Sequence, residues 1–464
     1  MMNSTTMFRR TAVLLIGAST IGLGPILTPT ASAQADVASL GAGGEYFPVA
    51  PERIYDTKDD VDSGRVSANG EITVPVVGLG GVPTDGVLAV AVNVTLVDAT
   101  GRGFVSVRPS DYDASGDEQT SLINFESDGQ TVPNFGIIGV GTEGALTIDI
   151  SSQIEGDVRV IVDVFGWVAK TAYDGADADD GARMQTVTPE RILDTRTTSS
   201  LRTQDSIEVP VRGQGPVPDD ANVSAVVINM TGVNNKSNST TTYLSASPDR
   251  VPAGQAEADS SNGNYEKGTV KANLAIVPLN DDGSIFVFNR AGRTDVLIDV
   301  VGYLTTPDAA DETRTGRIVP LESPFRSFDT RSSEFGAARL GFSSWEDWSF
   351  QKFADSVSLN GVSVGEQGGL LGNVTAAGLQ RNATTPDTPA RSFLTLNPEV
   401  ALDDSNEPTA PGNSNLNFAE GGAVANSAVI TYGSNGAGDE NMVSAYNSDG
   451  STHYILDVYA VILD

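Results

Sequence analysis

The sequence predicts an all-β protein of three tandem homologous antiparallel β-sandwich domains, with jelly-roll or Ig-like topology. Three observations support this fold class. One octapeptide motif occurs three times at wide spacing. Short segments in which apolar and polar residues alternate follow each copy of it, and 49 Gly with 23 Pro supply the turns between these segments. No convincing amphipathic helix is present in the first two copies.

The opening motif reads PERIYDTK from residue 51, PERILDTR from residue 189 and PFRSFDTR from residue 324. The copies therefore begin 138 and 135 residues apart. That spacing is ordinary for an autonomous domain and too long for the units of a solenoid, which need neighbours to bury their faces. We expect each copy to have its own core.

Four further landmarks follow the octapeptide in the same order in every copy. An alternating segment comes first: EITVPVVG (71–78), SIEVPVRG (206–213) and, more loosely, DSVSLNGV (355–362). An apolar strand with Asn-x-Thr and a Ser- and Asn-rich element ending in an aromatic residue come next. A long apolar strand with Asp-Val closes each copy, as VIVDVFGW, VLIDVVGY and YILDVYAV. The repeated order indicates an array of homologous domains.

These landmarks predict the organisation of the chain. A secretory signal peptide is expected at 1–33, because Arg9 and Arg10 precede an apolar stretch and Ala31-Ser32-Ala33 forms an A-x-A cleavage site. We call residues 45–168, 184–304 and 316–464 repeats 1, 2 and 3; acidic linkers at 169–183 and 305–315 separate them. No later stretch has the ~20 apolar residues of a transmembrane helix. We therefore expect a secreted protein, extracellular or at the cell surface.

Composition excludes several classes of function. Without the signal peptide the chain has 26 Lys and Arg against 60 Asp and Glu, a balance of −34 that argues against nucleic acid or anionic membrane as partners. The sequence has one His and no Cys, which argues against catalysis by a Ser–His or Cys–His pair and against a His-rich zinc site. A carboxylate pair is the remaining common catalytic device. The acidity fits a salty habitat or the binding of divalent cations.

With these landmarks, the chain resembles a repeat family of secreted and cell-surface proteins, mostly from actinobacteria. That family opens with P-x-R-[IL]-[LY]-D-T-R and closes with V-D-V-x-G-Y, matched here by Pro189–Arg196 and Asp299–Tyr303. The resemblance covers about residues 46 to 464 and implies an extracytoplasmic β-rich module with no agreed biochemical activity. Repeat 3 departs from the pattern, because Pro324-Phe325 replaces Pro-Glu and Ala460 stands where Gly is expected.

The charged residues of the octapeptide form the first candidate site. In repeat 2, Arg191 and Arg196 are placed to clamp Asp194, which leaves Thr195 to cap a backbone group. The functional alternative is an anion or sugar site, since arginine forks suit carboxylate and hydroxyl groups. Presence in every copy favours a structural salt-bridge network. The expected members are Arg53, Asp56 and Lys58, then Arg191, Asp194 and Arg196, then Arg326, Asp329 and Arg331.

Two polar residues recur within the apolar strands. The closing strand carries an Asp (Asp163, Asp299 and Asp457), and the mid-domain strand carries an Asn (Asn93, Asn229 and Asn373). A buried carboxylate needs a partner, because burial without one raises its pKa and lowers stability. Pairing with the opening arginine across the sheet is favoured over a catalytic role. For the Asn, we favour a side-chain amide that forms hydrogen bonds to a neighbouring loop over a glycosylation site.

Two local features suggest ligands. In residues 111–118, Asp111, Asp113 and Ser115 match the first half of an EF-hand calcium loop. The position at which that loop carries its bidentate Glu is occupied by Leu122. Calcium is therefore a weak candidate, and no other metal or cofactor is expected. In repeat 3, the segment 341–353 has no evident counterpart and is rich in aromatic residues, including Trp345, Trp348, Phe350 and Phe353. Its spacing predicts a short amphipathic helix covering the sandwich or, alternatively, an exposed platform for a glycan or a protein.

From these features we expect a secreted, non-catalytic protein of the cell envelope that acts in adhesion, surface-layer assembly or wall association. The expected partners are envelope glycans, surface proteins or further copies of the chain. The alternatives are an array of carbohydrate-binding modules that uses the repeat 3 aromatics, and a glycan hydrolase that uses carboxylates.

Overall fold

The computed structural model describes residues 8–9, 43–61, 64–112, 120–152, 157–171, 173, 175, 180–252, 254–258, 260–307, 313–349, 358–359, 362–363, 367–381, 391–434 and 442–464. Most of the expected signal peptide lies outside these residues. Within them the protein is all-β, as expected, with helical turns at α2 (Thr57–Asp60), η2 (Thr195–Thr197) and η3 (Ser333–Phe335). No helix in this part of the chain is long and apolar enough to cross a membrane.

Each repeat contributes two antiparallel sheets with a common set of four strands, which we call its inner and its outer sheet; β3 additionally pairs with β10 in repeat 1, and β1 with β20 in repeat 3. The inner sheets have the orders β2-β10-β5-β8, β11-β18-β13-β16 and β19-β28-β23-β26. The outer sheets have the orders β4-β9-β6-β7, β12-β17-β14-β15 and β20-β27-β24-β25. The three repeats therefore share one strand topology.

The strands have the following bounds. Repeat 1 contains β2 (Tyr46–Asp56), β3 (Val66–Ser67), β4 (Glu71–Pro75), β5 (Val87–Ala99), β6 (Gly103–Pro109), β7 (Ile123–Phe125), β8 (Gln130–Gly139), β9 (Ala145–Ser152) and β10 (Asp157–Ala169). Repeat 2 contains β11 (Arg183–Asp194), β12 (Asp205–Pro210), β13 (Val223–Val233), β14 (Thr242–Ser247), β15 (Gly263–Tyr265), β16 (Val270–Pro278), β17 (Ser284–Asn289) and β18 (Asp295–Thr305). Repeat 3 contains β19 (Ile318–Asp329), β20 (Ser344–Ser349), β21 (Ser358–Leu359), β22 (Val362–Ser363), β23 (Gln367–Gln380), β24 (Arg391–Asn397), β25 (Leu416–Ala419), β26 (Ala423–Thr431), β27 (Met442–Asn447) and β28 (Ser451–Leu463).

The inner and outer sheets differ in how many of their faces are buried. In the outer strand β4 only Val74 is buried, so the strand presents one face to solvent. The inner strand β5 is buried along nearly its whole length. One face of the inner sheet packs on the outer sheet of the same repeat, and Val92 of β5 belongs to the same core cluster as Val105 and Val107 of β6. Its other face must be covered by something outside the repeat, because a strand buried on both faces needs two packing layers.

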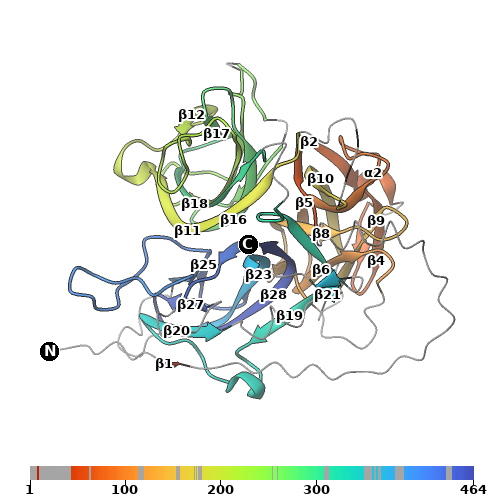
Figure 1. Ribbon diagram of the computed structural model, residues 1–464. Helices are drawn as coiled ribbons and strands as arrows, with labels where there is room; N and C mark the ends of the chain where they lie inside the picture. Colours follow the sequence, from red (N-terminus) through yellow and green to blue (C-terminus); the bar gives the residue numbers. More distant parts are fainter. Residues whose placement is uncertain are drawn as a thin grey trace.

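The second face of each inner sheet packs against the other repeats. A common core contains residues of all three: Ala91, Phe135 and Phe165 of repeat 1, Val227 and Leu274 of repeat 2, and Leu371 and Ile462 of repeat 3. Figure 1 shows the result as three lobes that meet around one centre, near which the chain ends. The repeats thus form one closed body.

The expectation of three tandem sandwich domains, jelly-roll or Ig-like, is therefore wrong. The six sheets are arranged as a six-bladed β-propeller of small sheets. The physical reason is the apolar second face of each inner sheet. If the repeats were separate domains, this face would remain in water. The protein would then lose a stabilisation of roughly 25 cal/mol for each Å² of apolar surface that the neighbouring repeats bury.

The aromatic segment 341–353 also differs from its expected form. It contains strand β20, which pairs with β27 and occupies the position of β4 and β12 in the other repeats. The expected helix and the expected lack of a counterpart are both wrong. The segment 355–362, proposed as that counterpart, instead contains β21 and part of β22, which pair with each other. On its other side β20 pairs in parallel with β1 (Phe8–Arg9), within the expected signal peptide.

Candidate functional site

The recurring Asn and Asp of the inner sheets are cross-strand partners. Asn93 is paired with Asp163, Asn229 with Asp299 and Asn373 with Asp457. Each Asn lies on the face of its strand that points away from the repeat's own core, because side chains alternate along a strand. In β5, for example, Ala89 and Ala91 of the same face contribute to the common core. The two polar landmarks therefore face a neighbouring repeat.

The contact between repeats 3 and 1 shows what these side chains do. Asn373 Nδ2 donates to the Ser121 carbonyl, and Asn373 Oδ1 accepts a hydrogen bond of 2.9 Å from Asn134 Nδ2. The Ser121 backbone N–H donates to Asp457 Oδ2 at 2.9 Å. Asn134 Nδ2 also donates to the Leu122 carbonyl at 2.6 Å. We call this set, and its equivalents elsewhere, a repeat junction.

The junction between repeats 2 and 3 has the same geometry. Asn229 Nδ2 donates to the Ser414 carbonyl, and Asn229 Oδ1 accepts from Asn426 Nδ2 at 2.9 Å. Asn426 Nδ2 also donates to the Asn415 carbonyl at 2.6 Å. The same residue types thus satisfy the same backbone groups one repeat further along the chain.

The third junction closes the ring. Asn93 Nδ2 donates to the Ser261 carbonyl at 3.4 Å, and Asn93 Oδ1 accepts from Asn273 Nδ2 at 3.4 Å. Repeat 1 thus contacts repeat 2, repeat 2 contacts repeat 3 and repeat 3 contacts repeat 1. The bonds of this third junction are the longest of the three sets, so it is the weakest polar contact in the ring.

The opening arginine of each octapeptide forms an ion pair with the junction Asp of the same repeat. Arg191 donates from Nε to Asp299 Oδ1 at 2.7 Å and from Nη2 to Asp299 Oδ2 at 2.9 Å. Arg191 Nη1 also lies 4.0 Å from Asp194 Oδ2, and Arg326 Nη1 lies 3.6 Å from Asp329 Oδ2, so both arginines of the motif contact its Asp as expected. Only Arg196 binds Asp194 in a bidentate manner. The equivalent pairs are Arg53 with Asp163 and Arg326 with Asp457, plus Arg331 with Asp329.

The Asp and Thr of the octapeptide end the first strand of each inner sheet. Asp194 accepts from the backbone N–H of Arg196 at 3.0 Å and so caps the turn η2. Thr195 Oγ1 accepts from the backbone N–H of Val296 in the closing strand at 2.8 Å. In repeat 1 the cation paired with Asp56 is Arg159, on strand β10, and not Lys58 as expected. The octapeptide thus joins its strand to the closing strand in several ways.

Burial gives the junction carboxylates unusual electrostatics. It raises the pKa of Asp457, which is 0% exposed, against the opposing effect of Arg326, and it likewise raises the pKa of Asp299. The pKa of Asp194 is lowered, chiefly by its hydrogen bond from Arg196. Such opposed shifts can mark a catalytic acid and base. Here, however, both oxygens of Asp457 accept hydrogen bonds from protein groups, and neither pocket described below is lined by it.

Sequence reasoning missed the partner residues of the junctions. Ser121, Asn134 and their equivalents are absent from the predicted site residues, although a Ser and an Asn recur in the repeats at separations of 13, 12 and 12 residues. This nearly constant separation was the available signal. It did not show that the partner of each Asn lies in a different repeat, because the partners are 168, 185 and 252 residues apart.

The tryptophans proposed as a binding platform are core residues. Trp345 and Trp348 are each 2% exposed. Trp345 Nε1 donates to the Thr409 carbonyl at 2.9 Å, and the Trp348 ring stacks on Phe328 at 5.2 Å between centroids. Buried indoles cannot stack on a sugar, so the platform does not exist as proposed. Phe350 and Phe353 lie outside the described residues.

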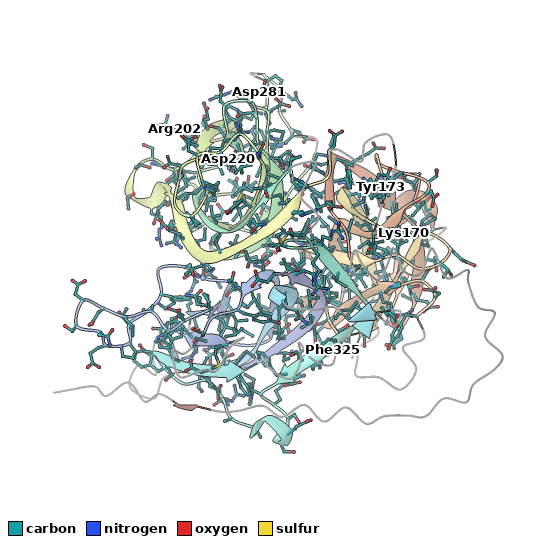
Figure 2. All side chains as sticks on the ribbon, in the orientation of Figure 1. Lys170, Tyr173, Arg202, Asp220, Asp281 and Phe325 are labelled. Carbon is teal, nitrogen blue, oxygen red and sulfur yellow. The ribbon has the colours of Figure 1, made fainter. Side chains whose placement is uncertain are left out.

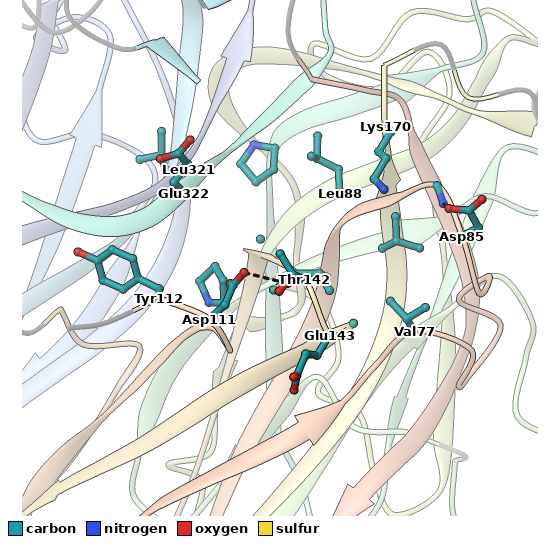
Figure 3. A pocket seen from close by; sticks show the side chains of 18 of the residues that line it. Val77, Asp85, Leu88, Asp111, Tyr112, Thr142, Glu143, Lys170, Leu321 and Glu322 are labelled. Atoms are coloured by element: carbon teal, nitrogen blue, oxygen red, sulfur yellow. Dashed lines mark hydrogen bonds between the residues drawn. The ribbon is translucent and has the colours of Figure 1, made fainter. Parts of the chain in front are cut away.

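Asp111, one of the calcium candidates, lies at the edge of an open groove between repeats 1 and 3. The groove measures about 950 Å³, and Asp85, Asp111, Glu143 and Glu322 line it with Lys170 (Figure 3). Asp111 Oδ2 accepts from the Thr142 backbone N–H at 3.0 Å, a bond that lowers the pKa of Asp111. Asp113 and Ser115 lie outside the described residues. Across the part of the chain that the structure describes, no three His, Cys, Asp or Glu side chains gather around a metal position.

Comparison with known proteins adds little to this geometry. No family model matches the chain, and no curated protein matches it. Among solved structures, a chain from the atomic structure of the Sulfolobus turreted icosahedral virus is similar over 90% of this chain and 99% of its own length, with 8% identity. Its TM-score is 0.16, so the likeness supports no argument about fold or function.

Proposed function

We propose that this protein is a secreted, non-catalytic component of the cell envelope that acts in adhesion, surface-layer assembly or wall association. The observation that supports this most is the role of the recurring charged and amide side chains. They bind one another and the backbone at the repeat junctions, so these side chains hold the repeats together and leave the loops as the surface for partners. The carboxylates on which a hydrolase would depend are bound to arginine in the same junctions.

The surface outside the junctions suits contact with large partners in a salty medium. Charged residues such as Arg202 and Asp281 lie at the periphery of the repeat 2 lobe and are exposed (Figure 2). The acidic groove of Figure 3 has four carboxylates against one ammonium, which favours a partner with cationic groups. Envelope proteins, envelope glycans with amino groups and further copies of the chain are the partners that we propose.

Fractionation of the native cells tests this proposal. We expect the protein in the wall or in a surface sheet, and we expect the purified chain to bind cells, isolated sacculi or itself. Retention in the cytoplasm, or release into the medium without binding to any of these three, would contradict the proposal. Hydrolysis of wall polysaccharide that is lost in a folded Asp329→Asn variant would instead support the hydrolase alternative.

A further inference from the structure

A second, smaller pocket is lined by all three repeats. It measures about 210 Å³ and lies where β8, β16 and β26 contact one another, bordered by β7, β15 and β25. Each repeat contributes the Asn that precedes the aromatic end of its Ser- and Asn-rich element: Asn124, Asn264 and Asn417. We call this the central pocket. Its volume is below the range of about 300–1,000 Å³ of drug-sized ligand sites, so it suits a small molecule or the end of a longer chain.

Repeat 2 departs from the other repeats at one position of this pocket. Lys271 lies two residues before the junction residue Asn273, and the same position holds Val132 in repeat 1 and Val424 in repeat 3. An apolar side chain therefore satisfies the fold at this position in two of three copies. The lysine is not required for closing the ring, so it needs another explanation.

The Lys271 ammonium is partly buried without a counter-ion. Among the described residues, no carboxylate lies within 4.0 Å of it, and burial lowers its pKa against a weaker opposing effect of Glu266. A buried ammonium without a partner destabilises a fold. A bound anion would remove that penalty, because an opposite charge favours the ionised form.

The acidic residues that also line the pocket are already engaged. Glu126 Oε1 accepts from the backbone N–H of Ala423 at 2.5 Å, and its other oxygen lies 3.9 Å from Arg102. Glu420 is paired with Arg381. These contacts hold both carboxylates and leave the lysine as the unpaired charge at this site, among the residues that the structure describes.

Repeat 2 also differs at its pocket asparagine. Asn124 Oδ1 accepts from the Ser121 hydroxyl at 3.4 Å, and Asn417 Nδ2 donates to the Ser414 hydroxyl at 3.2 Å. The buried Oδ1 of Asn264 has no hydrogen-bond partner in the described part of the chain. An orphan acceptor of this kind needs a donor such as a hydroxyl group.

We propose that the central pocket binds a small carboxylate that also carries hydroxyl groups, with Lys271 as the charge partner and Asn264 Oδ1 as the hydroxyl acceptor. A free hydroxy acid and the terminal uronic acid of a polysaccharide share this chemistry. The site depends on the ring, since its walls come from three repeats. It is independent of the envelope assignment, because the pocket follows from the fold whatever the location of the protein.

Glucuronate is the probe for this proposal, with glucose as the matched sugar without a carboxylate and acetate as the carboxylate without hydroxyls. The chain has six lysines, so reductive methylation with ¹³C-formaldehyde gives few lysine signals, and the signal lost in the Lys271→Val variant identifies that residue. We expect glucuronate to shift the Lys271 signal at pH 8 and to bind at least tenfold more tightly than glucose or acetate. A glucuronate-terminated oligosaccharide that binds as well as glucuronate would indicate a polysaccharide end, and a much weaker one would indicate a free acid.

Variants provide the second test. Lys271→Val, which gives repeat 2 the residue of the other repeats, is expected to fold and to weaken glucuronate binding at least tenfold. Lys267→Val, an exposed lysine on the preceding turn, is the matched control and should change binding less than twofold. If glucuronate leaves the Lys271 signal of the unmutated chain in place, or shifts all lysine signals alike, the proposal is wrong. Unchanged binding by Lys271→Val would overturn it equally.

Discussion

Replacement of Asn373 by Asp tests whether the repeat junctions are dry and necessary. Asn373 is 0% exposed, donates to the Ser121 carbonyl and lies opposite Asp457 in the sheet. An ionised carboxylate in the Asn373→Asp variant would lose the donor and place a second negative charge beside Asp457. The substitution preserves side-chain size, so packing contributes little to the outcome.

The magnitude follows from the burial. A fully buried carboxyl group commonly has its pKa raised by about 3 units or more, and each unit corresponds to about 1.4 kcal/mol between the two protonation states. We therefore expect Asn373→Asp to reduce the free energy of unfolding by about 4 kcal/mol at pH 8. The sign reverses the usual carboxylate behaviour: the folded pKa lies above the unfolded one, so stability is retained at low pH and lost as pH rises through the folded pKa. At pH 4.5 the protonated group can again donate to Ser121, and the loss should shrink to about 1 kcal/mol.

Urea unfolding followed by tryptophan fluorescence measures this effect, expressed as the difference from the unmutated chain at each pH. Asn280→Asp is the matched control, because Asn280 uses only its Oδ1, as acceptor from the Ser284 backbone N–H at 2.8 Å, and Asp supplies the same acceptor. A loss below about 1 kcal/mol at pH 8, or a loss that does not change between pH 4.5 and pH 8, would refute the water-free junction.

Three further variants test the other parts of the scaffold. Trp348→Ala should lower the free energy of unfolding by about 3–5 kcal/mol by leaving a cavity, whereas Phe342→Ala, at a side chain that is 52% exposed, should change it by less than about 0.5 kcal/mol in the same urea titration. Asp194→Asn should destabilise by about 1 kcal/mol at pH 7, and because Arg196 lowers the pKa of Asp194 the difference should begin to shrink as pH falls below about 4 and be lost below the folded pKa; thermal unfolding at pH 7 and pH 3 would show it, and a difference that does not shrink between these two pH values would argue against the ion pair. Thr195→Val removes the acceptor for a closing-strand backbone N–H at constant shape and should cost about 1–3 kcal/mol, with faster amide exchange at that N–H as the specific readout.

The sequence alone determined the local structure well. Alternation in EITVP and SIEVP, together with dense turn residues, predicted β-strands, and β4 and β12 lie there. It also determined which polar residues matter to every repeat, because Asp299 within an apolar strand required a partner and the opening arginine was the nearest candidate. Both inferences use information within one repeat, where period and composition are sufficient.

The continuous apolar closing strands contained a signal that the sandwich hypothesis did not use. A strand with one solvent-facing side alternates, whereas β10 and β28 are buried along almost their whole length. Such a run predicts that both faces are covered, but it does not identify the second covering layer. The helix expected at 341–353 failed for a related reason: aromatic residues at near-helical spacing are also compatible with a strand, and pairing with β27 decided between the two.

Only the tertiary structure decided where the recurring landmarks act. The Asn of one repeat meets the Ser carbonyl of another more than 160 residues away, and no local pattern records which partner a buried amide chooses. The sequence established that three related β units exist and which polar groups each must satisfy. The closed ring, its common core and the pocket shared by three repeats depend on contacts between distant segments, whose free energy is gained only when all three are assembled.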